Sequence, residues 1–507
     1  MRKLMLFSVL AGGVLLGLMQ PSIAQKKDED GDAAKKREDV FGKSFEDQVE
    51  EAVDAGCDAL KKTQGVDKKE DPAIFGQMKE APLYGAGEPH QYRIARTAFP
   101  IQALCKSGCF HDDPEIEKAM NYLRKNYKDA GAIQSLQGNV PSTTYEDVCV
   151  INAVEAYYIS AWEAKERKLD NPKNRFTKDA DGKKVPIKRW GTEEKGAKKA
   201  KEKKKERNFK LSKEDQKLAE LAVKAIETRA RKAYGAKGWR YQPTGRGESQ
   251  PEVDISATQY ALLGLKCASR LGLRYDKSLL MDSYHLFRTW QDQDGPVVKR
   301  VAKDADGKPV EDEGKKDKEK DKGDRGTSSR KWEPGAKDRA RGWSYTRKDQ
   351  HDPADLITYG SMTAAAVCGT IILRDELETD PAMQKRWKPV EDECQQMLND
   401  GLAWLVANWT MLENPKRGMH RYYYYLYTIE RLGMLGGLDW IGTHDWYVEG
   451  AKVLLEQQKP DGIWDPGHEI PPSDVYNTCY ALLFLKRAEE GIDRPKPVFT
   501  GGEYDDE

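Results

Sequence analysis

AKVLLEQQKPDGIWDPGHEIPPSDVYNTCYALLFLKRA, residues 451–488, joins a helix pattern with one polar face to a second helix pattern that is apolar nearly all round. A glycine and a tryptophan, Gly462 and Trp464, stand in the turn between the two patterns. A helix that is hydrophobic on every side must be buried on every side, and an amphipathic neighbour can cover it. The stretch therefore predicts an outer helix, a Gly/Trp turn and a buried inner helix.

The same unit occurs upstream. Gly238-Trp239-Arg-Tyr precedes DISATQYALLGLKCASRLGL, and Gly342-Trp343-Ser-Tyr precedes DLITYGSMTAAAVCGTIIL. Extended along the chain, the pattern predicts outer helices at about 46–64, 114–127, 212–234, 276–291, 390–410 and 441–458. It predicts inner helices at about 92–108, 144–163, 254–271, 354–374, 420–435 and 473–489.

Six such pairs predict an all-α fold, an α6/α6 toroid in which the helix pairs form two concentric rings. The alternative is an open solenoid, whose terminal repeats would need polar outer faces. The last repeat is the most regular of the six, which favours a closed ring.

The repeat also predicts the domain organisation. The toroid occupies residues 46–490, between a flexible charged segment at 25–45 and an acidic tail at 491–507. Charged insertions interrupt it at about 165–217 and 299–341.

Both insertions contain the sequence KDADGK, whose Asp and Gly residues favour a tight hairpin. A calcium-binding loop is the alternative, but the sequence lacks the further ligands of an EF-hand. Because the insertions supply no apolar helix, replacing 299–338 with a short Gly/Ser link is expected to leave the melting temperature nearly unchanged.

The charges are balanced overall, with 84 Lys and Arg against 84 Asp and Glu, but they are unevenly spread. Residues 165–217 hold 21 basic residues against 10 acidic ones. This excess lies in Lys/Glu-rich sequence with few aromatic residues, which is typical of solvated helix or disordered segments. We therefore expect no binding to nucleic acid.

The N-terminus has the pattern of a signal peptide. Two basic residues precede an apolar run from Leu4 to Met19, and a small-x-small site ends at Ala24. We expect residues 1–24 to be removed after Ala24 and the mature protein to be exported, to the periplasm or outside the cell. A retained anchor is the alternative, although 16 residues are short for a membrane span. Later segments have no run of 18 apolar residues, so we do not expect an integral membrane protein.

Eight cysteines in an exported chain could form disulfides. Six of them, however, lie in apolar helical patterns, where a buried thiol acts as a small hydrophobic side chain. These are Cys57, Cys105, Cys149, Cys267, Cys368 and Cys479. The redox state stays open.

The segment from Ala451 to Trp464 resembles the QW motif of squalene and oxidosqualene cyclases: an aliphatic helix end, Gln458, three residues, then Gly462-Ile-Trp464. Leu286–Gly295 resembles the first half of that motif, with its tryptophan displaced to Trp343, and Leu60–Gly65 is a weaker copy. The resemblance, over about 46–490, implies membership of the terpenoid cyclase and protein prenyltransferase superfamily. There the motif joins neighbouring repeats and has no role in catalysis.

The catalytic motifs of that superfamily are degenerate in this chain. The Asp-x-Asp-Asp acid motif of the cyclases corresponds to Glu252-Val253-Asp254-Ile255, in which one Asp survives and Glu and Ile replace its neighbours. Asn477 stands where the prenyltransferases have a zinc-binding histidine. Asn is a poor Zn²⁺ ligand. We therefore expect neither squalene cyclisation nor prenyl transfer.

In an α/α toroid the N-termini of all inner helices gather at one end, here termed the mouth. Polar residues near those N-termini converge there regardless of their separation in the sequence. The candidate mouth cluster is Asp254, His351, Asp355, His420, His468 and Asp474. The competing interpretation is that the aspartates are helix N-caps. Helix N-termini favour an anionic ligand, whereas His and Asp together would suit a divalent metal.

Two functions of different class remain. The first is a binding or scaffold protein that holds a ligand or a protein partner at the mouth. The second is an enzyme, isoprenoid-directed or metal-assisted, that uses the same cluster; the sequence identifies no cofactor or substrate. The tyrosine run at 422–425 with Tyr427 is either the lining of a cavity, where aromatic faces stabilise cations, or packing between the two rings.

Overall fold

The fold was analysed in a computed structural model. It describes residues 44–68, 70–76, 92–127, 133–135, 138–140, 143–178, 182–187, 210–233, 235–240, 253–298, 301–303, 309–311, 331–346, 356–465 and 474–489. Residues Glu46–Glu507 form one compact unit.

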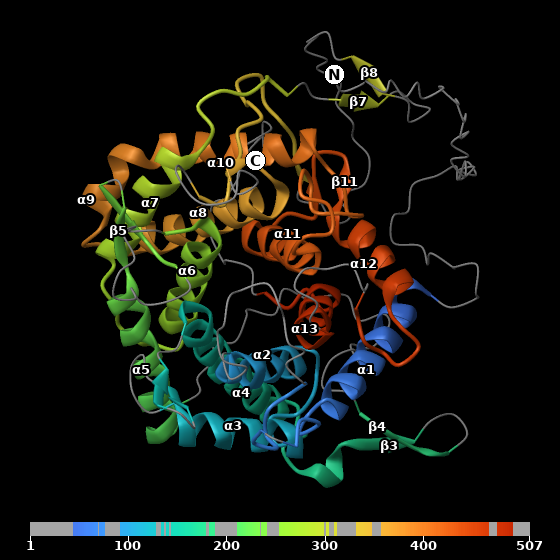
Figure 1. Ribbon diagram of the computed structural model, residues 1–507. Coiled ribbons are helices and arrows are strands. Elements are labelled where there is room, and N and C mark those ends of the chain that lie inside the picture. Colours follow the sequence, from blue (N-terminus) through green and yellow to red (C-terminus); the bar gives the residue numbers. More distant parts are fainter. Residues whose placement is uncertain are drawn as a thin grey trace, which may run out of the picture. The chain divides into compact units, whose positions relative to one another are not determined.

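Helices dominate this unit (Figure 1). The outer helices are α1 (Phe45–Lys62), α3 (Pro114–Asn126), α5 (Lys213–Arg229), α7 (Ser278–Trp290), α10 (Glu391–Ala407) and α12 (Trp446–Gln457). The inner helices are α2 (Arg93–Lys106), α4 (Thr144–Glu166), α6 (Ile255–Arg270), α8 (Gly360–Thr379), α11 (Tyr422–Gly436) and α13 (Asp474–Leu485). The short helices are η1 (Pro172–Asn174), α9 (Gln384–Trp387) and η3 (Lys388–Val390).

The strands are short and lie in the connections. They are β1 (Ile133–Ser135), β2 (Gly138–Val140), β3 (Phe176–Lys178), β4 (Lys184–Pro186), β5 (Arg231–Ala233), β6 (Ala236–Gly238), β7 (Val301–Lys303), β8 (Pro309–Glu311), β9 (Lys331–Trp332), β10 (Trp440–Ile441) and β11 (His444–Asp445). Apart from β9, which runs parallel to β10, the strands pair as antiparallel hairpins.

The predicted helix pairs are confirmed, with two corrections at helix starts and one at a helix end. The helix predicted to end at 234 ends at Arg229, because Arg231–Ala233 forms β5. The helix predicted from 354 begins at Gly360, because the backbone at Tyr359 is extended and its N–H donates to Trp343 O. The helix predicted from 441 begins at Trp446, because Trp440–Ile441 forms β10.

The inner helices form a closed ring. They contact one another in the order α2, α4, α6, α8, α11 and α13, and α13 contacts α2 again. All six run in the same direction. At one end, the N-terminal turns of α4, α6 and α11 share hydrogen bonds. Toward the other end, polar contacts join Lys106 of α2, Glu155 of α4, Lys266 and Arg270 of α6, Asp375 of α8, Glu430 of α11 and Glu489 after α13. The architecture is therefore an α/α toroid, and the open solenoid is wrong.

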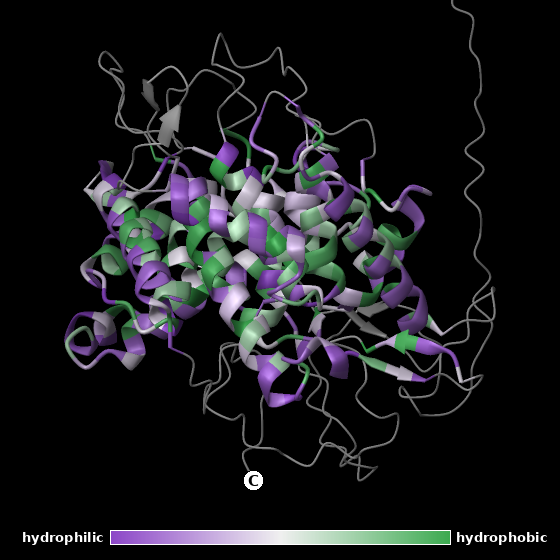
Figure 2. Cartoon of the chain, turned by 90° about the horizontal axis from the view of Figure 1, so that it is seen from below, coloured by the Kyte–Doolittle hydropathy of each residue, from purple (hydrophilic) through white to green (hydrophobic). Residues whose placement is uncertain are grey.

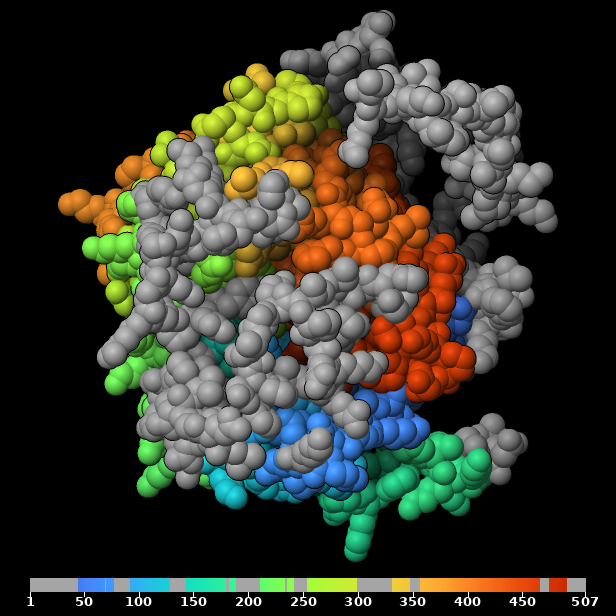
Figure 3. Space-filling view, in the orientation of Figure 1, coloured from blue at the N-terminus to red at the C-terminus, as the bar shows by residue number. Residues whose placement is uncertain are grey.

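The outer ring closes as well. Gln458, at the end of α12, donates from Nε2 to Ala52 O of α1 at 2.8 Å. A Cβ added at Gly462 would lie 2.4 Å from Ala55 O, so only glycine allows this approach. Figure 3 shows the first helix, in blue, directly beside the red surface of the last repeat.

Three tryptophans join outer to inner helices by the same two hydrogen bonds. The indoles of Trp239, Trp343 and Trp464 donate to a carbonyl of the preceding outer helix, at 2.7–2.8 Å. Their backbone N–H groups donate to a threonine hydroxyl in the first turns of the following inner helix, at 3.0–3.2 Å. The three side chains have no exposed surface. The Gly/Trp turn thus links each pair of helices, as the repeat predicts.

Gln64 and Gln291 act as Gln458 does. Gln64 donates to Glu115 O in α3 at 2.8 Å, and Gln291 donates to Met397 O in α10 at 3.0 Å. Each glutamine therefore joins consecutive outer helices, which is the structural role that the QW-like pattern implies.

Hydrophobic residues concentrate within the layer of helices (Figure 2). All eight cysteines are free thiols and seven of them are buried, which fits the interpretation as small apolar side chains. Among the described residues, no helix is both long enough and apolar enough to cross a bilayer.

Each KDADGK sequence lies between two strands that pair in antiparallel fashion, which fits the predicted hairpins. The first joins β3 to β4, with Lys178 opposite Lys184, and the second joins β7 to β8, with Lys303 opposite Pro309. The C-terminal end of 299–338 packs on the toroid, which argues against treating the whole segment as dispensable. Trp332 is 1% exposed, and β9, which contains it, pairs with β10.

We predict opposite results for two changes in this region. Replacing 301–326 with a short Gly/Ser link should shift the melting temperature very little, whereas Trp332→Ala should cost about 3–5 kcal/mol of unfolding free energy, because it leaves a large buried cavity. Thermal and urea unfolding measure both. A strongly destabilised link variant would show that the replaced residues contribute to the core.

Candidate functional site: the interior of the inner ring

The mouth end of the inner ring is joined by hydroxyl groups. Tyr145 of α4 donates to Ser256 of α6 at 2.6 Å, and Ser256 donates to Tyr424 of α11 at 3.0 Å. These residues lie in the first turn of their helices. The contacts bring three inner helices together across the ring at their N-termini.

Three of the six candidate mouth residues lie within the described residues. Asp254 is the N-cap of α6, and its Oδ1 accepts from Ala257 N at 2.6 Å. Asp474 opens α13, and its Oδ1 accepts from Val475 N at 2.8 Å. His420 is half-buried just before α11, and its carbonyl oxygen accepts from Asn414 at 2.9 Å. All three thus lie at the mouth end.

The remaining candidates, His351, Asp355 and His468, lie outside the described residues. Asp254 makes the contact of an N-cap aspartate, whereas, among the described residues, Asp474 accepts only from the N–H of the next residue. Within the described part of the chain, no group of three or more His, Cys, Asp and Glu is arranged to hold a metal ion.

Two acidic residues at the start of α4 have different environments. Asp147 accepts from Arg229 Nε at 2.6 Å and from Tyr127 at 2.7 Å. Glu146 forms a capping box with Thr143, and burial raises its pKa to about 7. Asp147 is therefore a structural anion, whereas Glu146 can change its charge near neutral pH.

The centre of the ring holds a buried arginine among tyrosine rings. The Arg431 guanidinium lies 4.2 Å from the ring centroid of Tyr427, 5.6 Å from that of Tyr260 and 5.8 Å from that of Tyr424. Arg431 has no exposed surface. Tyr480 packs against Tyr427 and Tyr424. Helices α6, α11 and α13 therefore meet at this tyrosine cluster.

Buried amide side chains surround the same interior. Asn152 of α4 and Gln259 of α6 have no exposed surface, and neither nitrogen nor oxygen of either amide has a hydrogen-bond partner among the described residues. Gln102 of α2 donates to Tyr427 at 3.5 Å, while its oxygen has no partner. Asn152 lies seven residues after Tyr145, on the same face of α4. The interior thus carries hydrogen-bonding capacity that the protein leaves unused.

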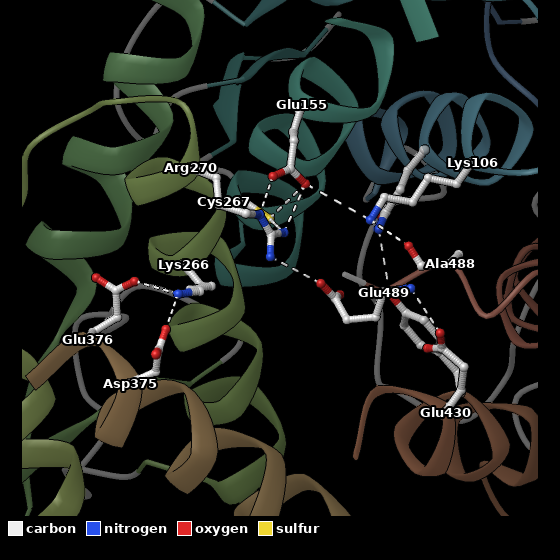
Figure 4. Close-up of polar contacts among 12 residues, drawn as sticks. Lys106, Glu155, Lys266, Cys267, Arg270, Asp375, Glu376, Glu430, Ala488 and Glu489 are labelled. Atoms are coloured by element: carbon white, nitrogen blue, oxygen red, sulfur yellow. Dashed lines mark hydrogen bonds and ion pairs between the residues drawn. The ribbon is translucent and has the colours of Figure 1, made fainter. Parts of the chain in front are cut away.

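The opposite end of the ring is closed by ion pairs (Figure 4). Arg270 contacts Glu155 through two nitrogens and lies 3.2 Å from Glu489. Lys106 lies 4.0 Å from Glu155 and donates to Ala488 O at 3.1 Å. These charges hold the pKa of Glu155 at about 2, despite its burial. We refer to Lys106, Glu155, Arg270 and Glu489 as the floor.

The tyrosine run on α11 faces two ways. Tyr422 and Tyr425 donate to Met411 O and Thr410 O, in the loop after α10, and so face the outer ring. Tyr424 and Tyr427 face Arg431. Helical periodicity separates the two sets.

Glu430, next to Arg431, is fully buried, and burial raises its pKa to about 8. The unfolded-state pKa of a glutamate is about 4.3, so below that pH Glu430 is protonated in both states and its contribution to stability is complete. As the pH rises from there through 8, the unfolded chain loses this proton first, and the contribution is lost. We therefore expect Glu430→Gln to be more stable than wild type by about 2–4 kcal/mol at pH 9 and to show a flatter stability profile between pH 5 and 9.

Urea unfolding across that range measures the effect. The replacement can keep the contact in which Glu489 N–H donates to Oε1 at 2.9 Å. Glu393→Gln is the control, because Glu393 has a lowered pKa and its contribution changes only in acid. Parallel profiles for wild type and Glu430→Gln would contradict the prediction.

No protein-family model and no curated protein matches the chain. A crystal structure of a family 76 glycoside hydrolase from a bovine Bacteroides thetaiotaomicron strain is similar to it, with a TM-score of 0.43 and 6% identity. The similarity covers 87% of this chain and 77% of that one. The resemblance to terpenoid cyclases and prenyltransferases therefore has no support from a family match.

The sequence did not identify the interior residues. Asn152, Gln259 and Arg431 are single polar residues in otherwise apolar helices, and this is the signal that could have found them. A buried polar side chain needs a partner. A polar residue at an inner-facing position of a helix buried on all sides is therefore a candidate contact for a ligand.

Proposed function

We propose that this protein binds a polar ligand inside the inner ring and that the ligand enters through the mouth. The observation that supports the proposal is the unused hydrogen-bonding capacity of Asn152 and Gln259. A buried polar group without a partner costs about 1–3 kcal/mol. Two whole amides kept at that cost, on adjacent helices of one ring, are explained if a ligand satisfies them.

The mouth is the favoured entrance because the floor is filled. Glu155 and Glu489 are at most 4% exposed, and both are paired with Arg270. At the mouth, the contacts across the ring are hydroxyl–hydroxyl bonds, which rearrange at lower cost than buried ion pairs. The candidate mouth cluster, including Asp254, His420 and Asp474, would then line the entrance.

Cation chemistry on an isoprenoid is disfavoured by Arg431. The tyrosine faces that could stabilise a carbocation already lie against a guanidinium, 4.2 Å from the ring of Tyr427. A second positive charge about 5 Å away would be repelled by about 3 kcal/mol at an effective dielectric constant of 20. Together with the degenerate motifs, this favours a binding protein over a cyclase.

An enzyme that uses Glu146 is the second candidate. A carboxyl group with a pKa near 7 at the mouth suits general acid–base catalysis at neutral pH. The capping box of α4 also accounts for its position, so the observation favours this function less strongly than the buried amides favour binding.

The proposed ligand would be met outside the cytoplasm if the N-terminus acts as a signal peptide. The export proposal rests on the apolar run and on the site that ends at Ala24. N-terminal sequencing of the protein from its native host should give a start at Gln25. A start at Met1 would contradict it.

Ligand-observed NMR with a library of small polar compounds tests the binding function. We expect compounds that bind the wild type to bind Asn152→Leu at least tenfold more weakly, because the amide contact is lost. Asn121→Leu is the matched control, since Asn121 is exposed on the outer helix α3. A library in which no compound distinguishes the two variants would overturn the proposal.

A further inference from the structure

We infer that the ligand of the inner ring carries a carboxylate, which pairs with Arg431 at the centre of the tyrosine cluster. This inference rests on the proposed binding function and specifies the chemistry of the ligand. The proposal follows from three observations: the donors of Arg431, the charge balance of the interior and the position of the aromatic rings.

The first observation is the unused donors of the guanidinium. Arginine has five N–H donors and no acceptor. Nη2 of Arg431 donates to Thr428 Oγ1 at 3.2 Å, whereas Nε and Nη1 have no hydrogen-bond partner among the described residues. Within the same residues, no carboxylate lies at ion-pair distance from Arg431. A fully buried arginine without an anion is costly, because desolvation is not offset by a counter-charge.

The second observation is the charge balance of the neighbouring groups. On the floor, Lys106 and Arg270 balance Glu155 and Glu489. Glu430 is largely protonated at neutral pH, since its pKa is about 8. The positive charge of Arg431 is therefore uncompensated by this part of the protein, and an anionic ligand would neutralise it.

The third observation is the position of the aromatic rings around the guanidinium. Tyrosine rings cover the guanidinium through cation–π contacts, the closest being Tyr427 at 4.2 Å. Beside these rings, Nε and Nη1 have no hydrogen-bond partner among the described residues. Planar N–H donors match the geometry of a carboxylate. Arg431 can thus donate to an oxyanion, and Asn152 of α4 and Gln259 of α6 remain for the polar remainder of the ligand.

The test compares anions with neutral analogues of the same shape. The probes are formate, acetate and benzoate, each with its primary amide, and inorganic phosphate as an anion of another geometry. Binding is measured by thermal shift and by ligand-observed NMR on the full mature chain. We expect at least one carboxylate to bind at least tenfold more tightly than its amide.

Arg431→Gln should abolish this preference, and Arg431→Lys should retain part of it, because the charge remains but the planar donors are lost. Arg374→Gln is the matched control; Arg374 is a mostly buried arginine of α8 whose partner, Glu378, lies at 2.7 Å. The control should keep the preference. Circular dichroism confirms that each variant is folded.

Two results would overturn the inference and leave the binding function intact. The first is that compounds sensitive to Asn152→Leu bind equally well to wild type and Arg431→Gln. The second is that no carboxylate binds the wild type better than its amide, while neutral compounds still bind in the Asn152-dependent way. Preferential binding of phosphate with no carboxylate preference would likewise overturn the choice of carboxylate. Failure of every compound to distinguish Asn152→Leu would instead remove the proposed function itself.

Discussion

Glu155→Ala is expected to lower the unfolding free energy by about 3–5 kcal/mol, because it removes one partner of a buried ion pair and leaves the other partner buried. Glu155 is 1% exposed. Its carboxylate contacts Arg270 through two nitrogens and accepts from the Cys267 thiol at 3.3 Å. Lys106 lies 4.0 Å away, on the far side of the carboxylate (Figure 4).

The floor makes this loss larger than a single pair would suggest. Arg270 retains Glu489, and Lys106 retains only the carbonyl of Ala488. Removing Glu155 therefore leaves the mostly buried Arg270 with a single carboxylate and Lys106 with a carbonyl group. Because α2, α4 and α6 all contribute to the floor, we expect unfolding to remain cooperative and its midpoint to fall.

Urea unfolding at pH 7 measures the change, and Glu393→Gln is the control. Glu393 also contacts an arginine, Arg288, but both side chains are about half exposed. An exposed pair of this kind contributes at most about 1 kcal/mol. Equal losses in the two variants would show that burial of the floor has no energetic consequence, contrary to the prediction.

The ring itself could be predicted because its signal is repeated. The inner helices are apolar nearly all round, and Trp239, Trp343 and Trp464 recur at the same place in their repeats. Inner helices that must be buried on every side, repeated at regular intervals with amphipathic partners, are enough to predict two concentric layers without knowledge of contacts between distant residues. The starts of two helices, at Gly360 and Trp446, could not be predicted, because a local backbone contact or a short strand decides them.

The interior contacts could not be predicted, because they depend on rotation of the helices about their axes. Tyr424 and Tyr425 are neighbours in the sequence, yet one faces Arg431 and the other faces the outer ring. Likewise, the segment 331–346 has the composition of the charged insertion, but Trp332 and Trp343 bury it against the toroid. A single large apolar side chain can bury a segment whose average composition predicts exposure to solvent.

Two buried asparagines should respond in opposite ways to the same substitution. Asn414→Leu is expected to lower the unfolding free energy by about 3–5 kcal/mol, because it leaves several buried groups without partners. Asn414 has no exposed surface, accepts from Ser361 N at 2.8 Å, and donates to Ser361 Oγ at 3.0 Å and to His420 O at 2.9 Å. It thereby ties the start of α8 to the loop before α11.

Asn152→Leu is expected to raise the unfolding free energy by about 1–2 kcal/mol in the absence of ligand, because it removes a buried amide whose polar atoms have no partner among the described residues. Leucine has a similar shape, so the gain in apolar contact is not offset by overpacking. Loss of binding combined with a gain in stability is the signature of a residue kept for function. Urea unfolding of both variants and of wild type measures whether the unfolding free energy falls in Asn414→Leu and rises in Asn152→Leu. If Asn152→Leu is destabilised as strongly as Asn414→Leu, Asn152 has a structural role and the argument for a ligand inside the ring fails.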